Sequence, residues 1–246
     1  MLWLAAAFFA TALLYASVGF GGGSTYNALL ALAGTDYRIL PLIALSCNVV
    51  VVAGSSIRYA HAGITPWRGA LALTALAAPA ALLGGLTPIG ERGFLLLLGA
   101  SLALTGLTLL IPVRDTRAGE PGVLARFIPF AAVPLGYLAG LVGIGGGIFL
   151  APLLHLVRWR DARAIAATAS LFILINSLFG LAGQLLKGGI ERFEAAIAFG
   201  LPLLLAVAIG GQIGSLLAVR LLPRHWIRWL TAALTLWVGL RLLLGE

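Results

Sequence analysis

Apolar segments, separated only by short polar breaks, account for almost all of the 246 residues. Of these residues, 61% are apolar and 10% are charged, whereas a soluble domain carries about 45–50% apolar and about 25% charged residues. The sequence therefore predicts an all-α polytopic membrane protein. It excludes a soluble enzyme, a DNA-binding module and a disordered protein. The eight segments expected to span or enter the membrane run approximately Leu2–Ala33, Ile39–Ala60, Trp67–Pro88, Phe94–Ile111, Phe127–Val157, Ala162–Leu186, Phe193–Val219 and Trp226–Leu244.

The net charge of +8 comes from basic residues that are spread through the polar breaks. Lys and Arg in such positions set membrane topology and contact anionic lipids, so we expect membrane lipids and no nucleic acid as partners. The single cysteine, Cys47, excludes an intramolecular disulfide and a metal site built from cysteines alone. We expect neither a metal nor a cofactor.

An internal repeat divides the chain into two related halves. Four anchors recur in the same order along the chain, which chance self-alignment of glycine-rich sequence does not explain. We expect a first transmembrane repeat over 1–112, a polar linker over 113–126 and a second transmembrane repeat over 127–246. The anchors pair Val18–Gly23 with Val142–Gly147, Asp36–Arg38 with Asp161–Arg163, Gly63–Ile64 and Gly84–Gly85 with Gly189–Ile190 and Gly210–Gly211, and Gly106–Leu107 with Gly239–Leu240.

Each half opens with a glycine run inside an apolar segment of 31 or 32 residues. A straight helix of that length would measure about 48 Å, whereas the hydrocarbon core is about 30 Å thick. Three consecutive glycines also oppose a helix by about 1 kcal/mol each. We therefore expect two helical pieces joined by an unwound turn, and such paired breaks indicate a substrate site in transporters. The alternative is close helix packing through glycine.

A new helix is expected to begin after each run, at Ser24-Thr25 and at Ile148-Phe149. The first-turn N–H groups of a helix have no intrahelical partner and lie at the positive end of its dipole. Glycine lets the backbone approach a ligand closely. Two such helix starts that face one cavity would bind an anion without a charged side chain.

Two four-segment halves that each open with Val-Gly-x-Gly-Gly-Gly resemble the sulfite exporter TauE/SafE family of membrane transporters. The stretch from Thr168 to Ser177 and the Gly188-Gly189-Ile190 loop add to this resemblance. It covers nearly the whole chain. It implies a secondary transporter, in the exporting direction, of a small and often sulfur-containing anion such as sulfite or an organosulfonate. It also implies a multi-pass location in the cell inner membrane.

The resemblance also implies a set of binding residues, carried over by position. The second half holds more polar residues than the first, so we expect Asn176 to contribute more than Asn48 to binding. For both Asn side chains, hydrogen bonding across helices is the structural alternative. The expected substrate-binding residues are Gly19, Gly21, Gly22, Gly23, Ser24, Thr25, Asn48, Gly143, Gly145, Gly146, Gly147, Thr168, Ser170, Asn176 and Ser177.

Other classes of function fit less well. An anion channel and a structural membrane assembly factor are the alternatives to a carrier. An intramembrane enzyme would need a nucleophile with a base, or paired carboxylates, within the bilayer. Because all eight acids and all three histidines lie in breaks or near segment ends, we expect no enzyme and no catalytic residue. The coupling ion, proton or sodium, and the oligomeric state stay open.

Two topologies fit the segments. If every segment crosses once, the halves are parallel and each side carries eight Lys and Arg residues. If each glycine-broken segment is a hairpin that returns to its own side, the halves are inverted, and the sides carry eleven and five. The positive-inside rule expects asymmetry. We therefore expect inverted repeats with hairpin tips at the midplane, the linker in the cytoplasm and both termini outside.

Overall fold

The computed structural model describes residues 1–17, 19–110, 127–216 and 224–245, and the predicted linker, 113–126, lies outside these ranges. Within them the chain is helical and contains no strand, which confirms the predicted all-α class. The helices are α1 (Leu2–Ala16), α2 (Gly23–Leu32), α3 (Leu40–His61), α4 (Trp67–Leu86), α5 (Glu91–Leu110), α6 (Ile128–Val142), α7 (Gly147–Leu156), α8 (Ala162–Leu216) and α9 (Arg224–Leu244).

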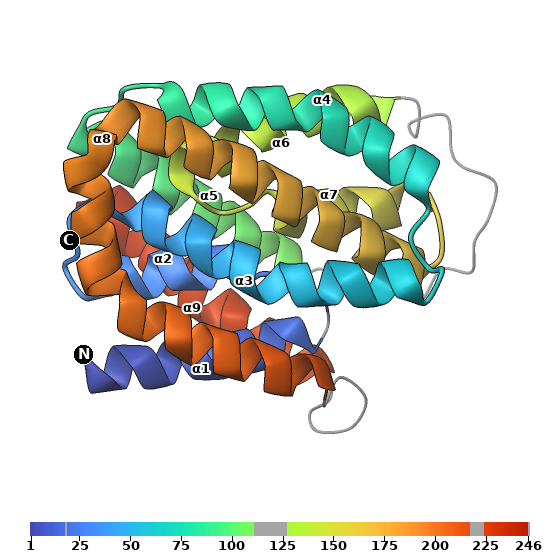
Figure 1. Cartoon of the computed structure of the whole chain (residues 1–246), viewed down its shortest axis with the longest axis horizontal. Helices are drawn as coiled ribbons and strands as arrows, with labels where there is room; N and C mark the ends of the chain where they lie inside the picture. Colours follow the sequence, from blue (N-terminus) through green and yellow to red (C-terminus); the bar gives the residue numbers. More distant parts are fainter. Residues whose placement is uncertain (18, 111–126, 217–223, 246) are drawn as a thin grey trace.

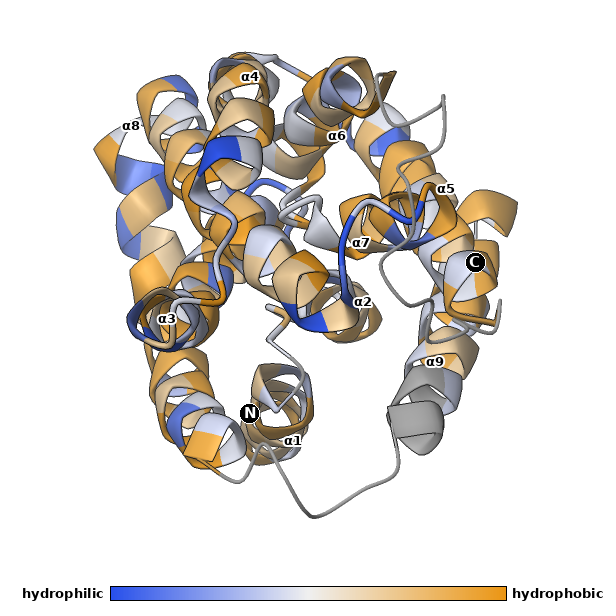
Figure 2. Cartoon of the chain, turned by 90° about the vertical axis from the view of Figure 1, so that its right-hand side faces the viewer, coloured by the Kyte–Doolittle hydropathy of each residue, from blue (hydrophilic) through white to orange (hydrophobic). Residues whose placement is uncertain are grey.

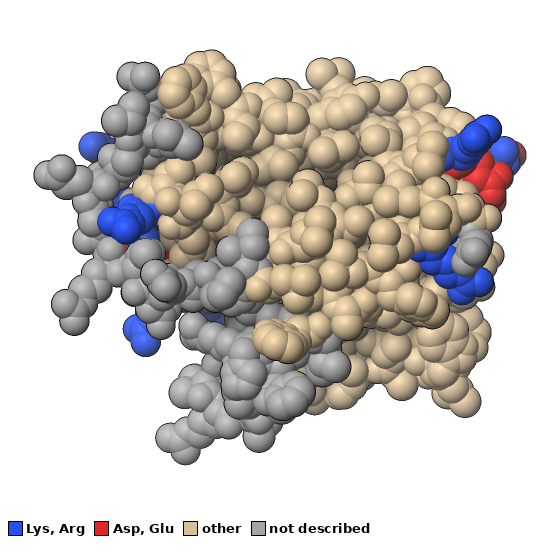
Figure 3. Space-filling model, turned by 180° about the vertical axis from the view of Figure 1, so that it is seen from behind, with Lys and Arg blue, Asp and Glu red and all other residues tan. Residues whose placement is uncertain are grey.

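The helices lie roughly along one long axis (Figure 1). On the face shown in Figure 3, charged side chains gather at the two ends of this axis and uncharged residues cover the surface between them. Among the described residues, four helices are long and apolar enough to cross a membrane. The 22 residues of α3 correspond to about 33 Å of helix, close to the thickness of a hydrocarbon core of about 30 Å. The chain is a multi-pass membrane protein.

Both glycine runs break the helix, as predicted. The first run separates α1 from α2, and the second separates α6 from α7. The residues that precede the new helices, Gly22 and Gly146, have φ of 93° and 72°. Side chains other than glycine rarely adopt this left-handed conformation. The glycines therefore allow each chain to turn sharply before the next helix starts.

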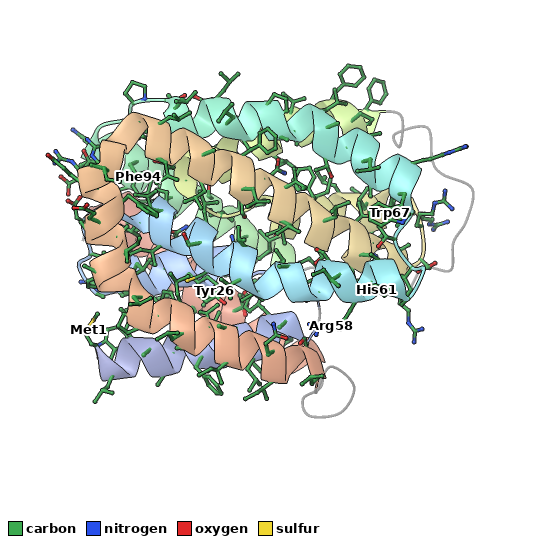
Figure 4. The ribbon with its side chains drawn as sticks, in the orientation of Figure 1. Met1, Tyr26, Arg58, His61, Trp67 and Phe94 are labelled. Carbon is green, nitrogen blue, oxygen red and sulfur yellow. The ribbon has the colours of Figure 1, made fainter. Side chains whose placement is uncertain are left out.

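The first glycine-broken segment begins and ends at one end of the bundle. The N-terminus and Phe94 lie at this end, opposite Trp67 (Figures 1 and 4). The ring of Tyr37, just after α2, packs 5.8 Å from the ring of Phe94. The segment therefore returns to the end from which it started.

The second glycine-broken segment opens toward the other end. Ile128, at its start, packs in one cluster with Leu73 near the beginning of α4. Trp159, just after the segment, contacts Gly69, two residues from Trp67. The two segments thus enter the bundle from opposite ends, and the inverted-repeat arrangement in the membrane stays a prediction. The sidedness of these ends in a membrane stays a prediction.

Helix α8 contains two predicted segments. Its 55 residues are interrupted at Gly189, where φ is 70° and ψ is −177°, and the chain turns back there (Figure 1). We call 162–188 the first arm and 190–216 the second arm. The two arms match the two separate crossings expected from the sequence.

Glycines outside the runs bring helices into close contact. Seen from the end that carries Trp67 (Figure 2), α4 and α6 lie side by side, with hydrophobic residues prevailing along them. The second arm of α8 instead lies beside α1 (Figure 1). An added methyl group at these glycines would collide with a main-chain carbonyl group, so helix packing explains them. The pairs are Gly136 with Ala77 and Gly140 with Ala81 between α6 and α4, and Gly210 with Phe9 and Gly214 with Leu13 between α8 and α1.

Candidate functional site

The side chain of Asn48 lies where the two glycine runs meet, near the middle of α3. A methyl group added to Gly21 or Gly23 would collide with the Asn48 amide. A methyl group on Gly145, from the other half, would lie 2.8 Å from its Nδ2 atom. Only glycine leaves room for the amide at these three positions. Backbone from both halves therefore surrounds one polar side chain.

Asn48 has no hydrogen-bond partner for either amide atom among the described residues, although its exposure is 0%. The Oγ atom of Ser177 is likewise buried and unpartnered there. It lies 3.4 Å from the place a methyl group on Gly145 would occupy. Buried polar groups in proteins almost always have partners, so these groups are suited to bind a polar ligand.

The wall opposite Asn48 is apolar. Gly21 and Gly145 each contact Asn48, and each also contacts Cγ2 of Ile173, at 3.2 Å and 3.0 Å from an added methyl group. Ile173 therefore occupies, in the second half, the position that Asn48 occupies in the first half. Asn176, three residues further along α8, is not the counterpart of Asn48. The site is polar on one side and apolar on the other.

Two helix starts flank this site. An added methyl group on Gly23, the first residue of α2, would lie 2.7 Å from the carbonyl oxygen of Ile144 in the second run. Gly147, the first residue of α7, packs on Ile173. The predicted helix starts thus both lie beside the centre. At α7 the N–H groups of Gly147 and Phe149 donate to the carbonyl oxygens of Gly145 and Gly146, so most of the first-turn N–H groups that can bind an anion belong to α2.

The outer glycines of the runs lie further toward the ends of the bundle. Gly19 packs against the ring of Tyr59, near the C-terminal end of α3, and Gly143 packs against Pro41 near its start. The tips therefore pass beyond the centre before each chain turns back. Gly22 contacts Tyr26, and Gly146 contacts Phe172. Gly22 and Gly146 thus support the turns, and Asn48 is not among their nearest neighbours.

Three predicted hydroxyl groups have protein partners. Thr168 donates to the carbonyl of Ala164 in its own helix at 2.8 Å. Ser170 and Ser56 share a hydrogen bond of 3.0 Å. Thr25 and Tyr15 share another of 3.0 Å. These contacts give each hydroxyl a structural role.

Two further predicted residues are buried and unpartnered without contacting the central glycines. Asn176 has no partner for either amide atom and Ser24 none for its hydroxyl, within the part of the chain that the structure describes. Both side chains are at most 1% exposed. Their binding role stays a prediction.

A cavity of about 290 Å³ opens near Phe94. Arg38, Lys187 and Arg192 line it, together with Leu141 from the last turn of α6. The cations come from two polar breaks that are far apart in the sequence, so no local sequence pattern indicates this cluster. The cavity provides a positively charged approach toward the second glycine run.

The comparisons with known proteins agree with this architecture. Residues 3–242 match the family described as Sulfite exporter TauE/SafE. The chain belongs to this family. A relative from Sinorhizobium fredii, described as probable membrane transporter protein y4hK, is 34% identical over 250 residues, which cover 98% of this chain and 97% of the relative.

Two more distant TauE/SafE-like relatives carry similar descriptions. Probable membrane transporter protein YunE from Bacillus subtilis is 21% identical over 226 residues, 80% of this chain and 81% of its own. Probable membrane transporter protein MamO from Paramagnetospirillum magneticum is 28% identical over 114 residues, 45% of this chain and 18% of its own. No solved structure matches the chain. The family and these relatives identify a membrane transporter.

Proposed function

We propose that this transporter exports a small, sulfur-containing anion, such as sulfite or an organosulfonate, and binds it at the Asn48 site. The observation that carries the proposal is the contact of Gly21, Gly23 and Gly145 with one buried, unpartnered amide. Glycine-broken segments of two halves form the substrate sites of many carriers. The family description, which names sulfite export, supports the choice of substrate class.

The proposed site holds the anion without a charged side chain. Nδ2 of Asn48 and the hydroxyl of Ser177 donate hydrogen bonds, and the starts of α2 and α7 add main-chain N–H groups. Ile173 contacts the less polar part of the ligand. The spans have no central carboxylate that would repel an anion. Neutral donors also release the ligand more readily than a buried ion pair would.

The proposal includes the arrangement in the membrane. The repeats 1–112 and 127–246 are inverted halves in the cell inner membrane, so the cavity near Phe94 opens to one side of it. Movement of the halves against each other exposes the Asn48 site to either side in turn. The family is one of transporters, and we propose no enzymatic activity.

Counterflow in proteoliposomes tests the proposal. Purified protein is reconstituted with unlabelled sulfite inside, and uptake of labelled sulfite, an organosulfonate or acetate is followed, with and without proton and sodium gradients. Saturable exchange of sulfite or the organosulfonate supports a carrier. Unsaturable conductance indicates a channel, and no flux of any of the anions would contradict anion transport.

A further inference from the structure

Arg58 lies near the end of α3 (Figure 4) but directs its side chain inward. It stands three residues before His61, the last residue of the helix. Its Nη2 atom lies 3.0 Å from the place a methyl group on Gly54 would occupy. Gly54 is one helical turn closer to the middle of α3. The guanidinium group therefore points back along α3, toward the middle of the helix and away from its end.

This direction is unusual for arginine at the end of a membrane helix. Such side chains normally extend toward the interface, where water and lipid headgroups solvate the charge. The C-terminal end of α3 is about 4.5 Å of helix away from Arg58, so the outward route is short. An inward guanidinium is costly without an anionic partner. In the described residues, its Nη2 atom is buried and has no hydrogen-bond partner.

Gln212, on the second arm of α8, lies beside this group. Its Nε2 atom is 3.4 Å from the same methyl position on Gly54. Gln212 is exposed and Arg58 is partly exposed, so the pair is open to a solute or to a lipid headgroup. Neither α3 nor the stretch 200–216 of the second arm contains an acidic residue. These two stretches thus offer hydrogen-bond donors and no carboxylate.

We propose that Arg58, with Gln212 beside it, is a second binding site for the transported oxoanion. The cavity lined by Arg38 and Lys187 lies near Phe94, whereas Arg58 lies toward the end that carries Trp67. The next residue, Tyr59, packs on Gly19 at the start of the first glycine run. An anion held by Arg58 is therefore placed next to the loop that leads to Asn48. This inference rests on the proposed function.

The test compares Arg58→Gln with Arg68→Gln. Arg68 is exposed and lies at the same end of the bundle as Arg58. The Arg68→Gln variant removes the same positive charge as Arg58→Gln. Sulfite counterflow is measured over a range of concentrations in vesicles of phosphatidylcholine alone. Loss of a charge-assisted hydrogen bond costs about 1.5–3 kcal/mol, so we expect Arg58→Gln to raise KM about tenfold or more. We expect Arg68→Gln to change KM by less than about twofold.

Arg58→Lys keeps the result interpretable if Arg58→Gln fails to fold, as judged by size-exclusion chromatography. Lys retains the charge but not the planar fork of donors, so its KM should lie between those of the wild type and Arg58→Gln. Equal KM values for wild type, Arg58→Lys and Arg58→Gln would overturn the inference while leaving the proposed function intact. The absence of any flux in the wild type would instead overturn the proposed function.

A lipid phosphate offers the same oxoanion chemistry. The measurement is therefore repeated in vesicles that contain phosphatidylglycerol. An effect of Arg58→Gln in phosphatidylcholine alone supports the solute site. An effect that appears only with phosphatidylglycerol would assign Arg58 to a lipid headgroup and overturn the inference.

Discussion

The Nδ2 atom of Asn27 donates a 3.0 Å hydrogen bond to the carbonyl oxygen of Val142. The two residues are 115 positions apart, and both are fully buried. Asn27 lies in the first turns of α2, and Val142 is the last residue of α6, directly before the second glycine run. This bond ties one glycine-broken segment to the other beside Asn48. The central site thus depends on both segments being in place together.

Gly145→Ala should impair transport. Its φ is +82°, so alanine adds backbone strain of roughly 1–2 kcal/mol, and the added methyl group would lie 2.8 Å from Nδ2 of Asn48. We expect the sulfite counterflow rate to fall by about tenfold or more, which corresponds to about 1.4 kcal/mol.

Gly34→Ala is the matched control for that variant. Gly34 also has positive φ, +66°, but has no atom within 4 Å of an added methyl group. We expect it to lose stability from the same strain while keeping its transport rate. Equal losses of transport in Gly34→Ala and Gly145→Ala would show that strain alone explains the effect.

Asn48→Ala should weaken sulfite binding more than Asn176→Ala. The polar composition of the second half favours the opposite order, but Asn48 is among the nearest neighbours of Gly21, Gly23 and Gly145, whereas Asn176 is not. Loss of a hydrogen bond to a charged ligand costs about 1.5–3 kcal/mol, so KM for Asn48→Ala should rise about tenfold or more. A larger rise for Asn176→Ala would place the site elsewhere.

Ser177→Ala and Ser170→Ala should separate binding from structure. Both serines are fully buried on the first arm of α8, two turns apart. Ser170 is hydrogen-bonded to Ser56, so its loss should cost about 1 kcal/mol of stability and leave KM unchanged. Ser177 is unpartnered among the described residues, so its loss should raise KM. Thermal unfolding and counterflow of both variants provide the measurements, and a raised KM in Ser170→Ala alone would contradict the assignment.

Cysteine labelling tests the inverted arrangement. Single cysteines are placed at Thr116, which lies outside the described residues, and at Arg160, in a Cys47→Ser background. A membrane-impermeant maleimide should label both from the same side if the glycine-broken segments are hairpins. Labelling from opposite sides would indicate single crossings. Glu91→Cys is the control, because both arrangements place it opposite Thr116.

Much of the fold follows from local sequence properties. Hydropathy locates the eight segments, and excess length with three adjacent glycines identifies the breaks before Gly23 and Gly147. The turn between the arms of α8 is less evident. Its polar residues indicate a break, but only the backbone of Gly189 leaves helical geometry there. Helix assignment depends on a few residues at a time, so the sequence predicts it well.

The site was predicted less completely because it depends on distant contacts. The glycines and Asn48 were expected, yet the equivalence of Asn48 and Ile173 appears only when the runs meet. Arg58 looks like a topology charge in sequence, since the direction of a long side chain depends on neighbours such as Gly54. Ser170 is an expected binding residue in the sequence, and its hydrogen bond to Ser56 depends on how α3 packs against α8.

The turn at Gly189 restricts how the second half can move. A single non-helical residue joins the two arms of α8, so the angle between them can change but neither arm can slide along the other. Helices α3 and α4 are instead joined by residues 62–66, which leave slack between them. The two arms of α8 therefore share one fixed end, whereas five residues separate the facing ends of α3 and α4.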